Sequence, residues 1–374
     1  MKTLIPILII TMILACLSSQ QSQRIINKSG ELEYVYKDKV FFFLMAFSMA
    51  FFVGLRTRGN DTYAYRLMYE AMPVGLNPIQ LMASTPVASS PGLNLLCATL
   101  RNLGATAQDY FMVCALLTNL TYLWFLRKYT TDIGLSIFYF ITMGVYTFTM
   151  AAIKQTLAVA FLLIATDRAI EKKWVKYIFW LTIAELFHPY AFVYLVVPFL
   201  SFSPWTKKNY LLLAGTVVVA LFMSTFMGAI GGLTDALGYD YDANAFSGTG
   251  VNLFRVIVVW VPVVLSYFCK EQLRDSEDRE LNILLNLSMM NSVIMFIGIF
   301  GTANYFARLA NYFLIFQCLA LPRILQKMGG TGLIKVASIV GFLGYFYYGT
   351  VLAQGSFDMT YGFMSVLDFF EQLF

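Results

Sequence analysis

Basic residues at the ends of long apolar runs are the first residues whose chemistry needs an explanation, because a charge at a membrane boundary is costly without a partner. The segment R-T-R-G-N-D at 56–61 follows one such run, and its glycine and asparagine predict a tight turn. Arg56 and Arg58 suit paired, charge-assisted hydrogen bonds to phosphate oxygens, and Asp61 suits a helix cap. The simpler alternative is that the arginines only anchor the chain among lipid headgroups.

Two further cations lie inside later apolar runs. Lys154, followed by Gln155, either extends to the membrane surface or faces an anion inside the protein. Later in the chain, spacings of three and four residues predict one polar helix face, made of Asn304, Arg308, Asn311 and Tyr312. Such a face within lipid indicates either a functional cavity or hydrogen bonds that join helices.

His188 is the only histidine of the chain. Glu185 precedes it by one helical turn, and Pro189 after it predicts the end of a helix. A carboxylate beside an imidazole raises its basicity, which suits a general base. A lone histidine is also commonly a hydrogen-bonded packing residue, so both roles stay open.

The composition decides which solvent surrounds these residues. Of the 374 residues, 59% are hydrophobic and only 13% are charged, too few polar side chains to cover a water-soluble globule of this size. Runs of about 20 apolar residues are typical of membrane-spanning helices, whereas barrel strands would alternate. The net charge of +5 comes from short clusters between apolar runs and does not indicate nucleic-acid binding.

We therefore predict an all-α polytopic membrane protein with about 12 transmembrane helices. It would form a single integral membrane domain over residues 1–374. The apolar runs lie at 4–18, 40–55, 109–126, 133–150, 152–168, 174–187, 190–202, 209–228, 251–269, 281–300, 305–322 and 333–353. The first run resembles a signal peptide, but we expect an uncleaved span. The runs on either side of Pro189 could instead form one broken helix.

The loop charges assign an orientation to these spans. With the loop 20–39 inside, most of the 26 Lys and Arg residues fall in inside loops, provided that 174–202 counts as two spans. Both termini then lie outside, and so do two longer segments, 56–108 and 229–250. The first contains four prolines that forbid a continuous helix and an amphipathic stretch from Leu93 to Leu103; the second contains Asp235, Asp240 and Asp242.

The five cysteines are scattered and show no CxxC spacing. We expect them to be small hydrophobic residues and not a disulfide or a metal site.

Four short motifs occur in an order that resembles the EpsG-like branch of the Wzy-type polysaccharide polymerases. They are R-x-R-G-N-D-T-x-x-Y from Arg56 to Tyr65, I-K-Q-T-L-A from Ile153, L-F-H-P-Y-A-F from Leu186 and A-R-L-A-N-Y-F from Ala307. The resemblance extends from about residue 40 to 325. It has two departures, because Lys154 stands where arginine is usual, and Ser90 stands where an acid often precedes Pro91-Gly92.

The resemblance implies a GT-C-like membrane glycosyltransferase that polymerises undecaprenyl-diphosphate-linked oligosaccharide repeat units for a capsule, an exopolysaccharide or an O-antigen. The reaction would occur at the outer face of a bacterial cytoplasmic (inner) membrane, facing the periplasm or the cell exterior, with neither metal nor cofactor. A chain-length regulator and a flippase of the same pathway are further partners that it leaves open.

In that reaction an acceptor hydroxyl attacks the donor's anomeric carbon, and the lipid diphosphate leaves. His188, steered by Glu185, or else Asp61, would deprotonate the acceptor. The diphosphate would be bound by Arg56, Arg58, Lys154, Gln155 and Arg308. The acceptor would contact Tyr65, Asn311 and Tyr312.

Three other functions remain open. A lipid-linked oligosaccharide flippase or transporter would also use buried cations, but it would show related halves, and the sequence has no internal repeat. A membrane O-acyltransferase also depends on one histidine. An O-antigen ligase shares the same chemistry, and the sequence separates it poorly from a polymerase.

Overall fold

The computed structural model describes residues 4–26, 32–236, 249–274, 278–329, 332–353 and 361–373. These residues are predominantly helical, as predicted. Contacts within the chain group it into two compact units. Unit 1 is Met1–Arg168, Lys173–Phe192 and Ala337–Phe374, and unit 2 is Ala169–Lys172 and Val193–Val336. Each unit is described by itself below.

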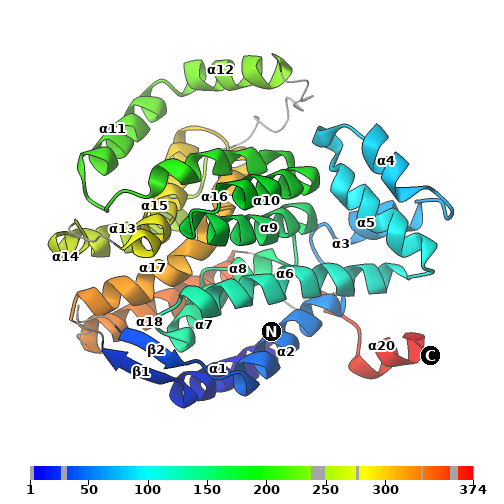
Figure 1. The fold of residues 1–374 in the computed structure, drawn as a ribbon, viewed down its shortest axis with the longest axis horizontal. Helices are drawn as coiled ribbons and strands as arrows, with labels where there is room; N and C mark the ends of the chain where they lie inside the picture. Colours follow the sequence, from blue (N-terminus) through cyan, green and yellow to red (C-terminus); the bar gives the residue numbers. More distant parts are fainter. Residues whose placement is uncertain are drawn as a thin grey trace. The chain divides into compact units, whose positions relative to one another are not determined.

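Unit 1 contains most of the chain's elements (Figure 1). Those wholly or mostly within it are α1 (Leu4–Gln21), β1 (Gln23–Ile26), β2 (Leu32–Tyr36), α2 (Val40–Gly54), β3 (Arg56–Arg58), α3 (Thr62–Glu70), α4 (Pro78–Ser84), the 3-10 turn η1 (Val87–Ser89), α5 (Pro91–Asn102), α6 (Ala107–Tyr129), α7 (Ile133–Thr142), α8 (Val145–Phe148), α9 (Ile153–Ile170), α10 (Trp174–Phe187), α18 (Gly332–Tyr347), the π-helical turn η4 (Tyr348–Leu352), β4 (Gly362–Phe363) and α20 (Val366–Leu373).

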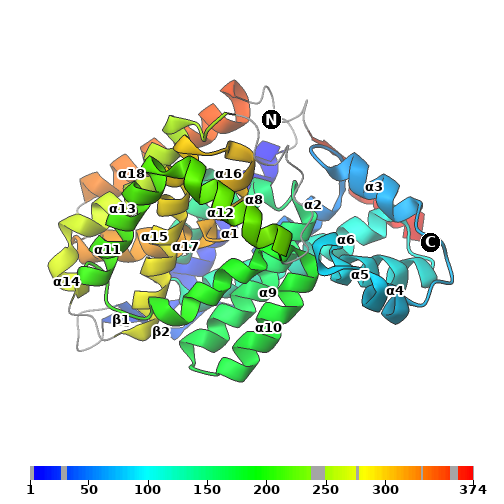
Figure 2. The ribbon, with the colours of Figure 1, turned by 90° about the horizontal axis from the view of Figure 1, so that it is seen from above.

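Helix α6 is the axis of unit 1. Its 23 residues give a length of about 35 Å, and a capping box between Thr106 and Asp109 begins it. It packs against α2, which in turn packs against α1. The short helices α3 to α5 lie at the end of α6 where it begins, and the hairpin β1–β2 lies toward its other end (Figures 1 and 2). Unit 1 therefore has two ends, one at the start of α6 and one at its last turn.

The segment 56–108 is broken into short helices, as its prolines predict. Pro78 and Pro91 stand at the first positions of α4 and α5, where a proline costs no hydrogen bond. Helix α5 coincides closely with the predicted amphipathic stretch and packs against α4 and α10.

Two small antiparallel sheets were not predicted. One is the β1–β2 hairpin within the predicted loop 20–39. In the other, β4 near the end of the chain pairs with β3, so that Arg56 lies opposite Phe363 and Arg58 opposite Gly362. The second sheet joins residues that are far apart in the sequence, which no local pattern signals.

Unit 2 is built around α15 (Arg279–Phe300), which packs against four other helices. The elements mostly within unit 2 are the 3-10 helix η2 (Pro189–Leu200), α11 (Lys207–Leu221), α12 (Met223–Ala236), α13 (Leu253–Phe268), α14 (Lys270–Arg274), α15, α16 (Ala303–Asn311) and α17 (Leu314–Lys327). Amide side chains join these helices. Gln317 donates to the carbonyl oxygens of Val259 and of the Asn291 side chain, at 2.9 and 2.7 Å.

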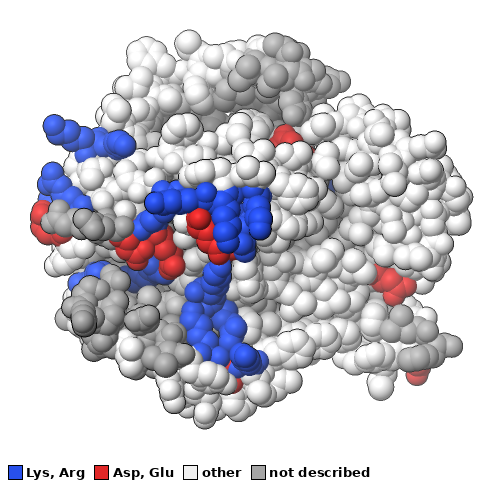
Figure 3. Space-filling view, viewed as in Figure 1, with Lys and Arg blue, Asp and Glu red and all other residues white. Residues whose placement is uncertain are grey.

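Each predicted apolar run falls on a helix or on a broken pair of helices. By length and composition, four described helices can cross a membrane, namely α1, α6, α15 and α18 with η4, or up to six if each bent pair counts as one span. Four shorter apolar helices accompany them. Figure 3 shows that most of the drawn surface is neither acidic nor basic. A helical membrane protein is thus supported, while about 12 crossings and a GT-C-like arrangement remain predictions.

Three predicted spans are bent where a continuous helix was expected. Run 133–150 breaks at Gly144, whose φ is 83°. Run 209–228 is α11 and α12, joined at an angle of 93°. Run 305–322 is α16 and α17, at 56°. Hydropathy alone missed these breaks, since the residues at each of them are as apolar as those on either side.

Candidate functional site

A tight turn follows α2, as the sequence predicts. Gly59 has φ of 120° and Asn60 has φ of 42°, so both lie in the left-handed region that these two residue types tolerate best. Asp61 stands at the N-cap position of α3, but its side chain accepts no capping hydrogen bond. The carboxylate of Asp61 is exposed. The predicted cap is therefore right in position and wrong in its hydrogen bond.

Arg56 is buried within unit 1, which argues against the alternative of a purely surface anchor for this residue. Its exposed fraction is 1%, while Arg58 is exposed. Two residues apart in a regular strand would share a face, but the register of β3 against β4 shifts between them. Nothing in the sequence distinguishes the two arginines, whereas the structure buries Arg56 and exposes Arg58.

The guanidinium of Arg56 is poorly paired for a buried cation. Its Nη1 donates to the carbonyl oxygen of Val53 at 3.3 Å, and its Nε has no hydrogen-bond partner among the described residues. No described carboxylate forms an ion pair with it. The guanidinium carbon lies 5.0 Å from the centre of the Phe111 ring, and burial lowers the pKa of Arg56. A buried charge with so few partners is costly unless an anion binds there.

Gln108 fixes the backbone that carries Arg56. Its amide nitrogen donates to the carbonyl oxygens of Gly54 at 2.6 Å and of Arg56 at 3.2 Å. Its amide oxygen accepts from Arg66 at 3.2 Å, and Arg66 also pairs with Glu70. Arg66 faces the same Phe111 ring as Arg56 but is paired and only half-buried.

Tyrosines, cysteines and a lysine from four helices and the C-terminal segment are linked to Arg56, either directly or through another member. We call this set the Arg56 cluster; it comprises Arg56, Tyr65, Cys97, Tyr110, Cys114, Lys154 and Tyr361, each of which interacts electrostatically with at least one other member. The backbone N–H of Lys154 donates to the Tyr65 hydroxyl at 3.4 Å. Three predicted residues, Arg56, Tyr65 and Lys154, are thereby brought together.

Burial keeps the neutral members of the cluster neutral. It raises the pKa of Tyr65 to about 12 and that of Cys97 to about 12. Neither group loses its proton near neutral pH, so neither is suited to act as a base or a nucleophile there. The cluster can bind and orient an anion, and a base must come from elsewhere.

The C-terminal segment contributes a residue that the sequence did not reveal. Asn60 donates from its amide nitrogen to the Tyr361 hydroxyl at 2.5 Å, and Tyr361 interacts electrostatically with Arg56. Downstream, the backbone N–H of Met364 donates to Leu55 at 2.8 Å, and Phe369 packs on Phe51. No motif near Tyr361 signals this role, because it depends on the pairing of β4 with β3.

His188 ends α10, as Pro189 predicts. It is extended, with φ of −154° and ψ of 121°, the conformation that a following proline favours. His188 therefore lies just outside the helix. The sequence placed it on one helical face with Glu185, but only Glu185 is within α10. Both side chains are half-buried, and each has an interaction partner.

The turn at His188 lies close to the start of α5. A Cβ at Gly92 would lie 3.0 Å from both the carbonyl oxygen of Leu186 and the ring of Phe187, so only glycine fits this approach without a shift. Phe187 also packs against the hydrophobic residues around Cys97 and Tyr110. Ser90, the residue at which the chain departs from the family pattern, is buried just before α5. His188 thus follows directly on the apolar surroundings of the Arg56 cluster.

Gln155 and the three candidates of unit 2 are placed as follows. Gln155 is buried in α9. Arg308 is exposed on α16 and has an interaction partner, and Asn311 is half-buried at the end of that helix. Tyr312 lies in the bend between α16 and α17 with its side chain fully buried, so it leaves the polar face on which it was predicted.

The end of α16 is held by a side chain from α15. The amide nitrogen of Asn291 donates to the carbonyl oxygen of Ala310 at 2.7 Å, and the backbone N–H of Phe313 donates to the same oxygen at 2.9 Å. These bonds fix the helix turn that carries Arg308.

The opposite end of unit 1 contains paired charges. Asp167, fully buried, accepts from the Tyr129 hydroxyl at 2.5 Å and forms ion pairs with Lys128 and Arg168. We call Lys128, Tyr129, Asp167 and Arg168 the Asp167 network. It joins the ends of α6 and α9 that lie away from the Arg56 cluster.

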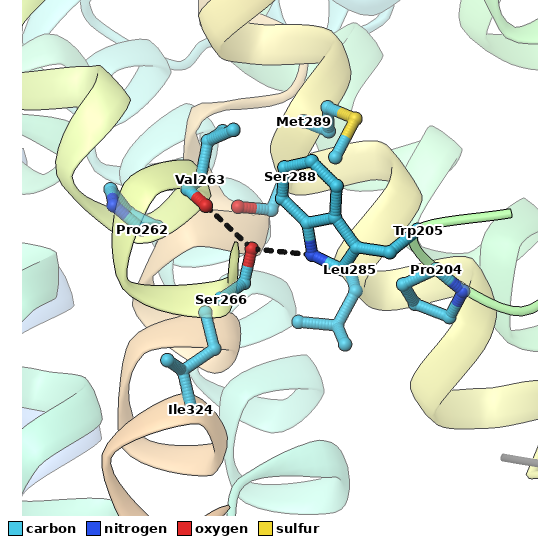
Figure 4. Close-up of a pocket in the computed structure, with 9 residues that line it drawn as sticks. All are labelled: Pro204, Trp205, Pro262, Val263, Ser266, Leu285, Ser288, Met289 and Ile324. Atoms are coloured by element: carbon cyan, nitrogen blue, oxygen red, sulfur yellow. Dashed lines mark hydrogen bonds between the residues drawn. The ribbon is translucent and has the colours of Figure 1, made fainter. Parts of the chain in front are cut away.

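A small cavity among the described residues of unit 2 is too small for a sugar. It lies between Trp205 and Ile324 and has a volume of about 10 Å³, enough for one water molecule at most (Figure 4). The indole nitrogen of Trp205 donates to Ser266 at its edge, at 3.1 Å. Across the described ranges, no group of three or more potential metal-ligating side chains converges. Residues 237–248 of the predicted outer segment 229–250, with Asp240 and Asp242, lie outside the described residues, and so does the side chain of Asp235.

Comparison with known proteins gives one match. The model of the EpsG family matches residues 39–364, which include all of the predicted site residues. No curated protein and no solved structure matches the chain significantly.

Proposed function

The chain belongs to the EpsG family, and from this we propose that it is a Wzy-type polymerase, a membrane glycosyltransferase that joins oligosaccharide repeat units carried on undecaprenyl diphosphate. The polymer would be a capsule, an exopolysaccharide or an O-antigen. The reaction would take place at the outer face of a bacterial cytoplasmic membrane, within about 12 membrane crossings of GT-C-like arrangement.

The observation that carries this proposal is the buried guanidinium of Arg56, whose Nε has no partner among the described residues. A desolvated cation with open donors favours an anion strongly, and a diphosphate presents several oxygens to it. Lys154, whose backbone N–H donates to the Tyr65 hydroxyl and whose side chain interacts electrostatically with Cys97, would add a second positive charge. Arg58, exposed in the same turn, suits the approach of the charged substrate.

The reaction transfers a glycosyl group. A hydroxyl at the non-reducing end of the acceptor attacks the anomeric carbon of the donor, and a new glycosidic C–O bond forms. The bond between that carbon and the lipid diphosphate breaks, and the diphosphate leaves with the electron pair. Arg56 and Lys154 stabilise the charge that develops on the leaving group. The acceptor's proton passes to a base, for which His188 and the exposed Asp61 are the two candidates.

The residues of unit 2 are tested separately. Arg308 would add a cation for the diphosphate, and Asn311 and Tyr312 would contact the acceptor. Because Tyr312 is fully buried in the helix bend, we expect its substitution to affect acceptor binding less than substitution of Asn311.

The decisive experiment is a reconstituted assay with lipid-linked repeat units. A polymerase yields longer lipid-linked chains, a flippase moves the same units across the bilayer unchanged, a ligase transfers finished polymer, and an acyltransferase adds an acyl group. We expect His188→Ala and Arg308→Ala to fold in membranes and to leave single repeat units on lipid. Long polymer from both variants would overturn these catalytic assignments, and translocation without elongation would overturn the proposed function.

A further inference from the structure

A groove lies at the end of unit 1 that contains the Asp167 network. It runs between the start of α2 and the last turn of α6 and has a volume of about 520 Å³. This volume is in the range of sites that bind ligands of moderate size. Its lining residues are Lys39, Val40, Phe42, Phe43, Leu44 and Arg127. The groove shares no residue with the Arg56 cluster.

Two cations with open donors stand at the groove. Arg127 donates from Nη2 to the carbonyl oxygens of Lys37 and Asp38, both at 2.9 Å, and its guanidinium lies 5.0 Å from the centre of the Phe42 ring. These contacts fix the guanidinium plane and leave Nε and Nη1 without a partner among the described residues. Lys39 is exposed and makes no side-chain hydrogen bond or ion pair within the described ranges.

The carboxylate of Asp38, next to Lys39 in the sequence, forms no ion pair with these cations among the described residues. Both oxygens of Asp38 accept hydrogen bonds from the first turn of α2, from Val40 at 3.2 Å and from Phe42 at 3.0 Å. The carboxylate is therefore used to begin the helix. The groove keeps a positive charge that can meet a phosphate.

The other side of the groove is apolar and exposed. The exposed fractions are 64% for Val40, 61% for Phe43 and 50% for Leu44. Together with Phe47 they follow the three- and four-residue spacing of one face of α2. A free phosphate would leave this face uncovered, whereas an acyl chain would cover it.

We propose that this groove binds one anionic phospholipid of the surrounding bilayer, with its phosphate between Lys39 and Arg127 and an acyl chain along Val40, Phe43 and Leu44. The ligand is a structural lipid at the end of α2 and is unrelated to the lipid-linked substrate. Basic sites between helices near the membrane surface bind anionic headgroups in this way. The proposal stands independently of the proposed function.

The test measures lipid binding to the purified protein by native mass spectrometry. The probes are phosphatidylglycerol and phosphatidylcholine with the same two oleoyl chains, and glycerol phosphate without chains. We expect phosphatidylglycerol to bind best and Lys39→Gln to weaken its binding roughly fivefold. Lys176→Gln removes another exposed, unpaired lysine from unit 1 and serves as the matched control, with a change of less than about twofold.

Three results would overturn the proposal. Equal losses in Lys39→Gln and Lys176→Gln would mean diffuse attraction to the whole basic end. Equal binding of phosphatidylcholine would remove the role of charge, and equally tight binding of glycerol phosphate would remove the role of the acyl chain. Melting of Lys39→Gln in lipid-free detergent should match the parent protein, because Lys39 makes no contact that folding needs.

Discussion

The two ends of unit 1 treat buried charge in opposite ways. In the Asp167 network the buried carboxylate has two cations and a tyrosine hydroxyl as partners. In the Arg56 cluster the buried guanidinium has one weak carbonyl contact, an aromatic ring and no carboxylate among the described residues. In the first arrangement opposite charges face the buried group, although Oδ2 of Asp167 accepts no hydrogen bond from a described residue; in the second no described carboxylate faces it.

The difference teaches where to look for function. Breaking a satisfied buried pair costs stability, whereas removing an unsatisfied buried charge costs little or even stabilises the fold. Such a charge lowers the stability of the folded protein, and its retention is explained if a bound ligand interacts with it. Substitutions at the two ends should therefore separate activity from stability.

The largest effect is expected for Arg56→Gln. Loss of the guanidinium should lower the elongation rate by roughly 10²–10³, the usual loss when one donor to a developing charge is removed. Stability should hold or rise, because no described carboxylate is left unpaired. Elongation of lipid-linked repeat units and thermal melting in detergent measure the two quantities.

Arg66→Gln is the matched control for Arg56. Arg66 faces the same Phe111 ring, at 5.4 Å, but it is paired and half-buried. Its substitution should change the rate less than about threefold, since its ion pair with Glu70 is partly exposed and contributes little. If the Arg56→Gln protein failed to fold, Arg56 would be a structural residue, and the contrast between the Arg56 cluster and the Asp167 network would be wrong.

Asp167→Asn should show the reverse behaviour. The substitution keeps the shape and removes the charge that Lys128 and Arg168 face, so the free energy of unfolding should fall by about 2 kcal/mol. Both cations are partly exposed and can turn to water, which limits the loss. Chemical denaturation in detergent gives the stability, and the elongation rate per folded molecule should stay the same. A large loss of that rate without a loss of stability would contradict the contrast between the ends.

Tyr361→Phe should have the smallest effect. It removes the acceptor for Asn60 beside Arg56, so kcat should fall about fivefold with little change in KM. Burial raises the pKa of Tyr361 to about 12, so the hydroxyl is protonated throughout the neutral range. The pH profile of the rate should therefore keep its shape. Tyr63→Phe, at an exposed tyrosine in the first turn of α3, is the control. A shifted profile for Tyr361→Phe would show that its hydroxyl titrates in the reaction.

Local features of the fold could be predicted from the sequence. The predicted run 174–187 has the bounds of α10, because Pro189 and the loop charges mark its ends. The turn at Gly59 and Asn60 and the helix at Leu93 also follow from neighbouring residues. The bends at Gly144 and Tyr312 did not follow, because hydropathy continues through them and tertiary packing decides the angle.

The site could be predicted only in part, for a related reason. Motif order selected Arg56, Tyr65 and Lys154, which the structure brings together. The same motif could not tell buried Arg56 from exposed Arg58, because the difference depends on a strand from the other end of the chain. Asn60 and Tyr361 are 301 residues apart. Pairing at such a distance leaves no trace in local periodicity.

The pairing of β3 with β4 also affects the order in which the surroundings of Arg56 form during synthesis. During synthesis α2 and the turn after it emerge long before residues 361–363, and contacts of such separation form late. The surroundings of Arg56 are then incomplete until the last part of the chain has been made. A partly synthesised chain would therefore insert its first helices before β4 and Tyr361 complete the surroundings of Arg56.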